Sequence, residues 1–158
     1  METETATRWL TEAEQYAWRT HLDVSRLLTH QLEKDLQPFG LTMNDYEILV
    51  NLSESDDQRM RMSDLATATL QSKSRLSHQI TRMETAGLVR REHCESDRRG
   101  LYAVLTDLGA GTMREVAPHH VESVRRHFMD LLTPEALADL HAALTPIADH
   151  LRGERGKP

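Results

Sequence analysis

The chain of 158 residues is poor in the residues that stabilise extracellular and all-β proteins. Its single cysteine, Cys94, cannot form an internal disulfide, so the cytoplasm is the expected compartment. Aromatic residues make up 4% of the chain, which favours helices packed with Leu, Ala and Met over a β-sandwich. No apolar run is long enough to span a bilayer, and METETATRWL at the N-terminus lacks the charged-then-apolar order of a signal peptide. We therefore expect a cytoplasmic protein that does not enter a membrane.

Signatures of catalysis are also missing from the sequence. Ser, His and Asp are plentiful, but no glycine-flanked nucleophile, phosphate-binding loop or metal signature occurs. We expect no enzyme and no required cofactor. Hydrophobic residues at 39% and charged residues at 28% are typical of a soluble globular protein, and the length fits one domain over residues 1–158.

Positive charge is scarce overall but concentrated in the middle of the chain. The formal net charge is −6, which argues against attraction of the whole surface to nucleic acid. Residues 59–99, however, contain nine basic and five acidic side chains, a net charge of +4, so the remainder carries −10. The chain is polarised, with a basic middle between acidic ends.

Capping residues and apolar spacing predict two helices in the first third of the chain. Thr11 and Glu14 have capping-box spacing at the start of a long amphipathic segment that ends before Gly40. Thr42 and Asp45 repeat that spacing before a helix of about three turns. The apolar face of this second helix would carry Tyr46, Leu49 and Leu52.

Two further helices joined by a short turn, followed by a hairpin, are predicted up to residue 106. Ser63 is expected to cap the first helix and Ser72 the second, which Gly87 ends. The apolar stripe of the second helix consists of Leu76, Ile80 and Met83. At 100° per residue, its opposite face carries Ser74, Arg75, Ser77, His78, Thr81, Arg82 and Thr85. LVRREH and LYAVLT are β-prone and flank a polar tip, so they predict the hairpin.

The C-terminal third is predicted to be helical. Thr106 caps a helix in which Pro118 is expected to cause a kink or a change of direction. Thr133 and Pro134 begin another helix. Its apolar residues recur at steps of three and four, as in a coiled-coil seam, at Leu137, Leu140, Leu144, Ile147 and Leu151. RGERGKP, residues 152–158, is expected to be a mobile tail.

This order of elements predicts a helix-turn-helix with a wing, an architecture that binds DNA. A helix face of arginines, a histidine and hydroxyls suits the major groove, where arginine reads guanine and hydroxyls reach base edges or phosphates. The hairpin tip would place Arg98 or Arg99 over an adjacent minor groove, with Asp97 orienting one of them through a charge-assisted hydrogen bond. The helix face alone is equally consistent with an ordinary solvated surface, and the basic hairpin favours DNA.

Residues 65–109, LATATLQSKSRLSHQITRMETAGLVRREHCESDRRGLYAVLTDLG, resemble the winged helix-turn-helix of the MarR (multiple antibiotic resistance regulator) family. The most telling elements are ITRMETAGLVRR and the wing pattern of Asp97 and Arg99 before a strand that ends in Leu105 and Thr106. FGLTMNDYEILVNL is similar to the second helix of that family, and RRHFMDLLTPEALADLHAAL to its last two. The resemblance therefore covers nearly the whole chain.

The resemblance implies a mainly α fold with a small β-hairpin wing. A winged helix-turn-helix at residues 42–106 would lie between an N-terminal dimerisation helix at 8–37 and C-terminal dimerisation helices at 107–151. The function implied is a sequence-specific transcription regulator, a repressor that binds a pseudopalindromic operator in double-stranded DNA as a homodimer. In this family a small-molecule effector often binds between the dimerisation and DNA-binding parts, and its identity here is unknown.

The same resemblance assigns the site residues. The recognition helix would contact DNA through Ser72, Lys73, Ser74, Arg75, Ser77, His78 and Arg82, and the wing through Asp97, Arg98 and Arg99. Dimerisation is expected at the leucine seam. The chain departs from the family's pattern at Leu70 and Gln71, which replace a Gly-Leu pair in the turn between the two helices, and at Ala136, where a second acidic residue is common.

Nine histidines raise the alternative of a zinc-responsive regulator with the same fold. His119, His120 and His127 lie on one predicted helix, but their spacing does not give the i, i+4 pair that a helical metal site favours. A site would need ligands from elsewhere, such as His30 or Glu33. Surface histidines are the simpler interpretation, and we predict no metal site.

Other features also have two interpretations. Cys94 lies beside Arg90 and Arg91 and could act as a redox switch, but its place in the wing favours an incidental exposed thiol. An effector pocket near the first helix could be lined by Trp9, Trp18, His21 and Asp23. Tryptophans at this spacing are more often interface or core anchors.

A different class of function, a helical protein-interaction module, accounts for the leucine-rich end helices but leaves the basic hairpin unexplained.

Overall fold

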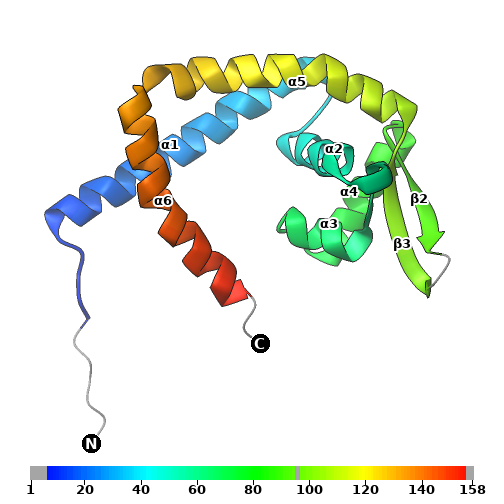
Figure 1. The fold of residues 1–158 in the computed structure, drawn as a ribbon, viewed down its shortest axis with the longest axis horizontal. Helices are drawn as coiled ribbons and strands as arrows, with labels where there is room; N and C mark the ends of the chain where they lie inside the picture. The colour runs from blue at the N-terminus through cyan, green and yellow to red at the C-terminus, as the bar shows by residue number, and fades with distance from the viewer. Residues whose placement is uncertain (1–6, 95–96, 156–158) are drawn as a thin grey trace, which may run out of the picture.

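The structure, a computed structural model, describes residues 7–94 and 97–155, except for the side chains of residues 97–99. These residues form six α-helices, short 3₁₀ turns and one antiparallel sheet, in the order α1 (Glu12–Leu36), α2 (Met43–Glu54), β1 (Arg59–Arg61), α3 (Met62–Ala68), α4 (Lys73–Thr85), β2 (Val89–Cys94), β3 (Asp97–Leu105), α5 (Asp107–His127) and α6 (Pro134–Arg155). Figure 1 shows α2, α3, α4 and the sheet gathered at one end, while α1, α5 and α6 extend away from them. The predicted mainly α fold with a β-hairpin wing is confirmed.

Local side-chain caps set the starts of α1 and α2. The Thr11 hydroxyl accepts from the Glu14 N–H at 3.3 Å, and the Glu14 carboxylate accepts from the Thr11 N–H at 2.7 Å. Thr42 and Asp45 form the same reciprocal pair at 3.1 and 2.9 Å. Both predicted capping boxes are therefore confirmed.

The expected cap of α3 is wrong. This helix begins at Met62 with Arg61 in the capping position and no side-chain cap, and the hydroxyl of Ser63 donates to Asp64 at 3.1 Å instead. After its pairing in β1 the chain is extended at Arg61 and helical from Met62, so Ser63 already lies inside the helix and its hydroxyl cannot be the N-terminal cap. Ser72 does cap α4, accepting from the Arg75 N–H at 3.2 Å.

The predicted hairpin is the pair β2 and β3, and a third strand that the sequence pattern missed extends it. Residues 59–61 of β1 pair with Tyr102–Val104 of β3, giving the order β1-β3-β2. Three residues are too few to show an alternating pattern. The guanidinium groups of Arg59 and Arg61 lie 5.0 and 5.6 Å from the Tyr102 ring centre, so cation–π contacts support the added strand.

One hydrophobic core joins the helices to the sheet. The predicted stripe of α4 is buried, since Leu76, Ile80 and Met83 are at most 1% exposed. These side chains belong to one cluster with residues from α2, the sheet and α5, among them Leu49, Leu52, Val89, Ala103 and Val116. Burial on this scale fixes the orientation of α4 and leaves its polar face outward.

A close approach between α5 and the hairpin fixes the base of the wing. Thr106 caps α5 by accepting from the Gly109 N–H at 3.0 Å, and its hydroxyl donates to the Gly87 carbonyl at 2.6 Å. A Cβ at Gly109 would lie 2.1 Å from the Leu88 carbonyl oxygen, so no larger residue fits there without moving backbone. The hairpin therefore leaves the core at a defined angle.

The end of the last helix differs from the sequence prediction. Pro118 lies inside α5, which continues to His127, and α5 ends at Phe128, whose φ and ψ are −145° and −64°. Residues 152–155 of the predicted mobile tail are the last turn of α6. An ion pair of 2.9 Å between Arg152 and Asp149 and the favourable place of basic residues at a helix C-terminus account for this extension. Residues 156–158 lie outside the described residues.

No helix within the described ranges combines the length and apolarity needed to cross a bilayer.

The turn between α3 and α4 contains a strained residue at the position where the family resemblance leads us to expect glycine. Leu70 has φ of +56° and is 69% exposed, so its side chain contributes little packing. Left-handed backbone costs a non-glycine residue about 1–2 kcal/mol, while glycine loses about 0.5–1 kcal/mol of extra entropy on folding. We expect Leu70→Gly to raise the free energy of unfolding by about 0.5–1 kcal/mol in urea denaturation. Leu70→Ala keeps the strain and is the control; a glycine variant less stable than the alanine variant would contradict the assignment.

Candidate DNA-binding surface

The outward face of α4 is polar and basic. All seven predicted recognition-helix residues, from Ser72 to Arg82, are exposed, whereas Leu76, Gln79 and Ile80 between them are buried. Arg75 projects from the first turn of α4, the part of a recognition helix that approaches base edges most closely in helix-turn-helix proteins. The exposure of these side chains is confirmed, and their contact with DNA remains a prediction.

Arg82 differs from the other residues of this face because it is tied to the protein. Its guanidinium donates to the Asp45 carboxylate at 2.6 Å, and 54% of its side chain remains exposed. A guanidinium held in this ion pair is poorly placed to read a base as well. The geometry therefore favours Arg75 over Arg82 as the base-reading arginine.

Asp45 joins α4 to α2. Only 1% of the residue is exposed, and its carboxylate accepts hydrogen bonds from the Thr42 N–H and hydroxyl, from the Gln79 amide at 3.1 Å and from Arg82. The sequence identified Asp45 only as part of a cap. Its long-range partners come from α4, 34 and 37 residues further along the chain, and no local pattern could have revealed them.

These contacts determine the ionisation of Asp45. Burial raises the pKa of its carboxyl, but the hydrogen bonds from Thr42, Gln79 and Arg82 together outweigh burial and hold the pKa below its ordinary value. The carboxylate is therefore charged whenever the protein is near neutral pH. A charged Asp45 keeps Arg82 and Gln79 in place and, through them, the outward face of α4.

The wing is fixed to the recognition helix by Arg91. Its guanidinium donates to the Ser77 carbonyl at 2.7 Å and to the Thr81 hydroxyl at 3.1 Å, and it forms an ion pair with Glu84. The Glu84 carboxylate also accepts from the Arg91 N–H at 2.8 Å. Strand β2 and helix α4 therefore form one rigid unit.

Asp97, Arg98 and Arg99 have their backbone in β3, but their side chains lie outside the described part of the chain, so their predicted contacts remain predictions.

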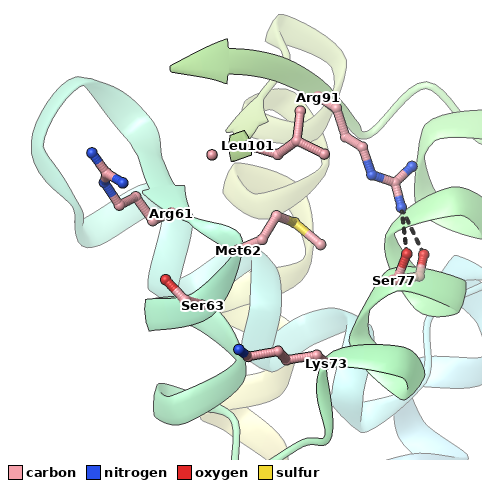
Figure 2. A pocket seen from close by; sticks show the side chains of 8 residues that line it. Arg61, Met62, Ser63, Lys73, Ser77, Arg91 and Leu101 are labelled. Atoms are coloured by element: carbon pink, nitrogen blue, oxygen red, sulfur yellow. Dashed lines mark hydrogen bonds between the residues drawn. The ribbon is translucent and has the colours of Figure 1, made fainter. Parts of the chain in front are cut away.

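A cleft opens between α4 and the β2–β3 hairpin (Figure 2). Helix α3 and strand β1 close its third side, through Arg61, Met62 and Ser63. In Figure 2, Met62 and Leu101 lie in the middle of the view, Arg91 is joined to Ser77 at one side, and Lys73 approaches from below. Sequence reasoning identified Lys73 and Ser77 but missed Arg61 and Arg91, whose basic character alone could have flagged them.

Comparison with known proteins agrees with this architecture. The model of the MarR family matches residues 39–100. The HTH-type transcriptional regulator PecS of Dickeya dadantii (strain 3937) is 31% identical over 136 residues, which cover 84% of this chain and 80% of PecS. The crystal structure of AbsC, a MarR family transcriptional regulator from Streptomyces coelicolor, is similar with a TM-score of 0.90 and 81% identity, over 93% of this chain and 99% of AbsC.

This chain belongs to the MarR family of transcriptional regulators. A second family member from Streptomyces coelicolor, Sco3205, was solved in complex with DNA. It is 42% identical to this chain, with a TM-score of 0.88 and 92% of each chain covered. The resemblance inferred from the wing and recognition-helix motifs is confirmed.

The zinc-responsive alternative finds no support in this MarR-family chain. Across residues 7–94 and 97–155, no three His, Cys, Asp or Glu side chains come together in a group that could hold a metal ion. The three histidines of α5 have separate surroundings: His119 packs on Phe39, His120 packs on Tyr46, and His127 lies 3.6 Å from the Asp35 carboxylate. Burial lowers the pKa of His120, which favours its neutral form.

The structure also places Cys94 and the two tryptophans near the N-terminus. Cys94, the last residue of β2, is 4% exposed, so the expectation of an exposed thiol is wrong. A thiol buried in this way is inert rather than reactive. Trp9 and Trp18 are exposed, and Trp18 stacks on His21 at 5.8 Å, so these side chains do not enclose a pocket within this chain.

Because hydrogen bonds lower the pKa of Asp45, the stability that they provide should depend on pH. This stability is fully present above the pKa of an unfolded Asp, about 3.9, and is lost as the pH falls through the lower pKa of the folded state. We expect Asp45→Asn to lower the free energy of unfolding by about 2 kcal/mol at pH 7. Measured by urea denaturation, the difference in free energy of unfolding between Asp45→Asn and the unmodified protein should become smaller below about pH 4.

Asp56→Asn changes an exposed carboxylate and serves as the control. It should unfold like the unmodified protein over the same pH range. An Asp45→Asn deficit that stays constant down to acid pH would show that the charge of Asp45 does not stabilise the fold.

Proposed function

We propose that this MarR-family regulator binds a pseudopalindromic operator in double-stranded DNA as a homodimer and represses transcription in the cytoplasm. The observation that carries the proposal is the exposed basic face of α4, held in place by Asp45 and joined to the wing by Arg91. This arrangement suits a helix in the major groove and a hairpin tip at the adjacent minor groove. The known DNA complex of Sco3205 supports it.

The dimer is proposed on the evidence of the end helices. No residue of α6, which is described throughout, is buried, and its seam leaves Leu144, Ile147 and Leu151 at least 42% exposed. Exposed apolar side chains of α1 and of the residues before it add to this surface at Trp9, Leu10, Tyr16, Trp18, Val24 and Leu27. A second copy would cover both helices through a two-fold interface, using residues 8–37 and 107–151, and would set two recognition helices about 34 Å apart.

A small-molecule effector is proposed at the hollow between α1 and α5. Phe39 and His119 lie side by side there, with ring centres 5.1 Å apart, and Arg126 and Ser123 also line it. The hollow is lined by α1, by α5 and by the 3₁₀ turn at residues 37–39 that leads from α1 towards α2, so an occupant would contact the junction between the two parts of the chain. Its mixed apolar and charged lining fits a small polar ligand with an apolar portion.

Salt-dependent binding to genomic DNA tests the proposal against a helical protein-interaction module. A gel shift with fragmented genomic DNA should give complexes whose affinity falls steeply between 50 and 200 mM salt, as phosphate contacts require. Absence of any salt-dependent complex would reject the DNA-binding function and leave the interaction module as the better account.

The two arginines of α4 should have different effects on DNA binding. Arg75 is expected to read a base edge, so Arg75→Ala should cost about 1–3 kcal/mol and relax the preference at one operator position per half-site. Arg82 is held by Asp45, and Arg82→Ala should weaken binding to all operators alike. Titration of both variants against a panel of single-base operator variants measures the loss of affinity and of base preference at each position. Equal losses on every sequence for Arg75→Ala would show that it touches only phosphate.

The wing arginines are also expected to differ. We expect Arg99 to enter the minor groove and Arg98 to lie nearer the phosphates, so Arg99→Ala should weaken binding most on operators with A·T-rich flanks, where the groove is narrow. Arg98→Ala should cost less, act on all sequences alike and serve as the matched control. Two operators that differ only in flank composition provide the measurement. The wing assignment fails if Arg99→Ala loses the same affinity for both operators, or if its loss of affinity is no larger than that of Arg98→Ala.

A further inference from the structure

The cleft of Figure 2 has a lining that recognition of bases does not explain. It holds about 340 Å³ between α3, the start of α4 and the wing. Met62 and Leu101 give it an apolar floor, while Arg61, Lys73 and Arg91 bring positive charge to its edges. None of its lining residues in the described part of the chain is acidic. The cleft thus combines an apolar surface with a cationic rim.

Two basic side chains at the rim, Arg91 and Lys73, differ in how firmly the protein holds them. Arg91 is held by Ser77, Thr81 and Glu84, so it shapes the wall and has little freedom to bind a ligand. Lys73 is exposed at the first residue of α4, and within the described residues no hydrogen bond or ion pair engages its ammonium group. The hydroxyl of Ser63 is exposed on the opposite side (Figure 2). Lys73 can therefore donate to an anion in the cleft, and Ser63 can do so when its hydroxyl turns away from Asp64, to which it donates at 3.1 Å.

The position of the cleft indicates which anion that is. A protein that places one element in the major groove and another in the adjacent minor groove must straddle the sugar–phosphate strand that separates the two grooves. The cleft lies between the elements proposed to enter those grooves, α4 and the hairpin. A deoxyribose phosphate has an apolar sugar face and a charged phosphate, which match the floor and the rim.

We infer that this cleft seats one sugar–phosphate unit of each operator half-site. The deoxyribose packs on Met62 and Leu101, and the phosphate accepts hydrogen bonds from Lys73 and Ser63. The inference rests on the proposed DNA-binding function and assigns Lys73 to backbone positioning, which carries no base preference. It also gives Ser63, which does not cap α3, a direct role.

Two variants test the cleft. Lys73→Gln removes one phosphate contact per protomer, so the slope of log K against log salt should become shallower by about 1.8 for a dimer, equally on all operators. Ser63→Asp places a carboxylate beside the phosphate and should lower affinity at least tenfold. An acid in the first turn of a helix favours the fold, so its thermal midpoint should not fall. Ser63→Ala, which removes the hydroxyl without adding charge, should lose much less affinity.

Arg114→Gln removes a positive charge from an exposed position of α5 outside the cleft and is the control for Lys73→Gln. It should leave the salt slope unchanged. The second arm uses operators with a neutral methylphosphonate at one backbone position per half-site. At the position seated in the cleft, and only there, Lys73→Gln and the unmodified protein should bind equally well.

The outcomes separate this inference from the function on which it rests. If the unmodified protein forms no salt-dependent DNA complex, the proposed function fails. If it binds DNA but Lys73→Gln keeps the full salt slope, or changes base preference instead, the cleft does not seat a phosphate and only this inference is overturned. The same holds if no methylphosphonate position cancels the effect of Lys73→Gln.

Discussion

The buried carboxylate of Asp45 is the contact on which the placement of the recognition helix depends. Apolar packing of Leu76, Ile80 and Met83 holds α4 against the core with its polar face outward, but apolar contacts are not directional and allow the helix to slide along its own axis. Directional hydrogen bonds from Gln79 and Arg82 to one charged group restrict that sliding. Asp45 also takes part in the N-terminal cap of α2. One carboxylate therefore fixes the start of α2 and holds α4 against it.

Two further contacts extend this anchor through the molecule. On one side Arg91 joins the wing to α4, so the helix and hairpin move as one body. On the other side the Glu33 carboxylate of α1 accepts from the Met43 N–H at 2.9 Å, and the hydroxyl of Ser123 in α5 donates to Asp35 of α1. Helix α1, which is proposed to dimerise, is thus connected by hydrogen bonds both to α5 and to the start of α2, the helix that holds Asp45.

Sequence patterns predicted the elements whose signals are local and missed the contacts that are not. Capping boxes at Thr11 and Thr42, the stripe of α4 and the β-prone segments of the hairpin each lie within a few residues, and all were confirmed. Strand β1 depends on a partner about 40 residues away and was missed, and so was the resulting start of α3 before Ser63. The outward face of α4 was predicted, but the role of Arg82 within it required its distant partner.

The central claim is that two copies of this chain present paired, rigidly held reading surfaces to DNA. Selection of bound sequences from a random DNA pool tests it most directly, because the result reports both sequence preference and symmetry. The account predicts enrichment of an inverted repeat with half-site centres about 10 base pairs apart, the separation that a dimer with one recognition helix per half-site requires. Enrichment of a single unpaired site, or of no sequence at all, would contradict it.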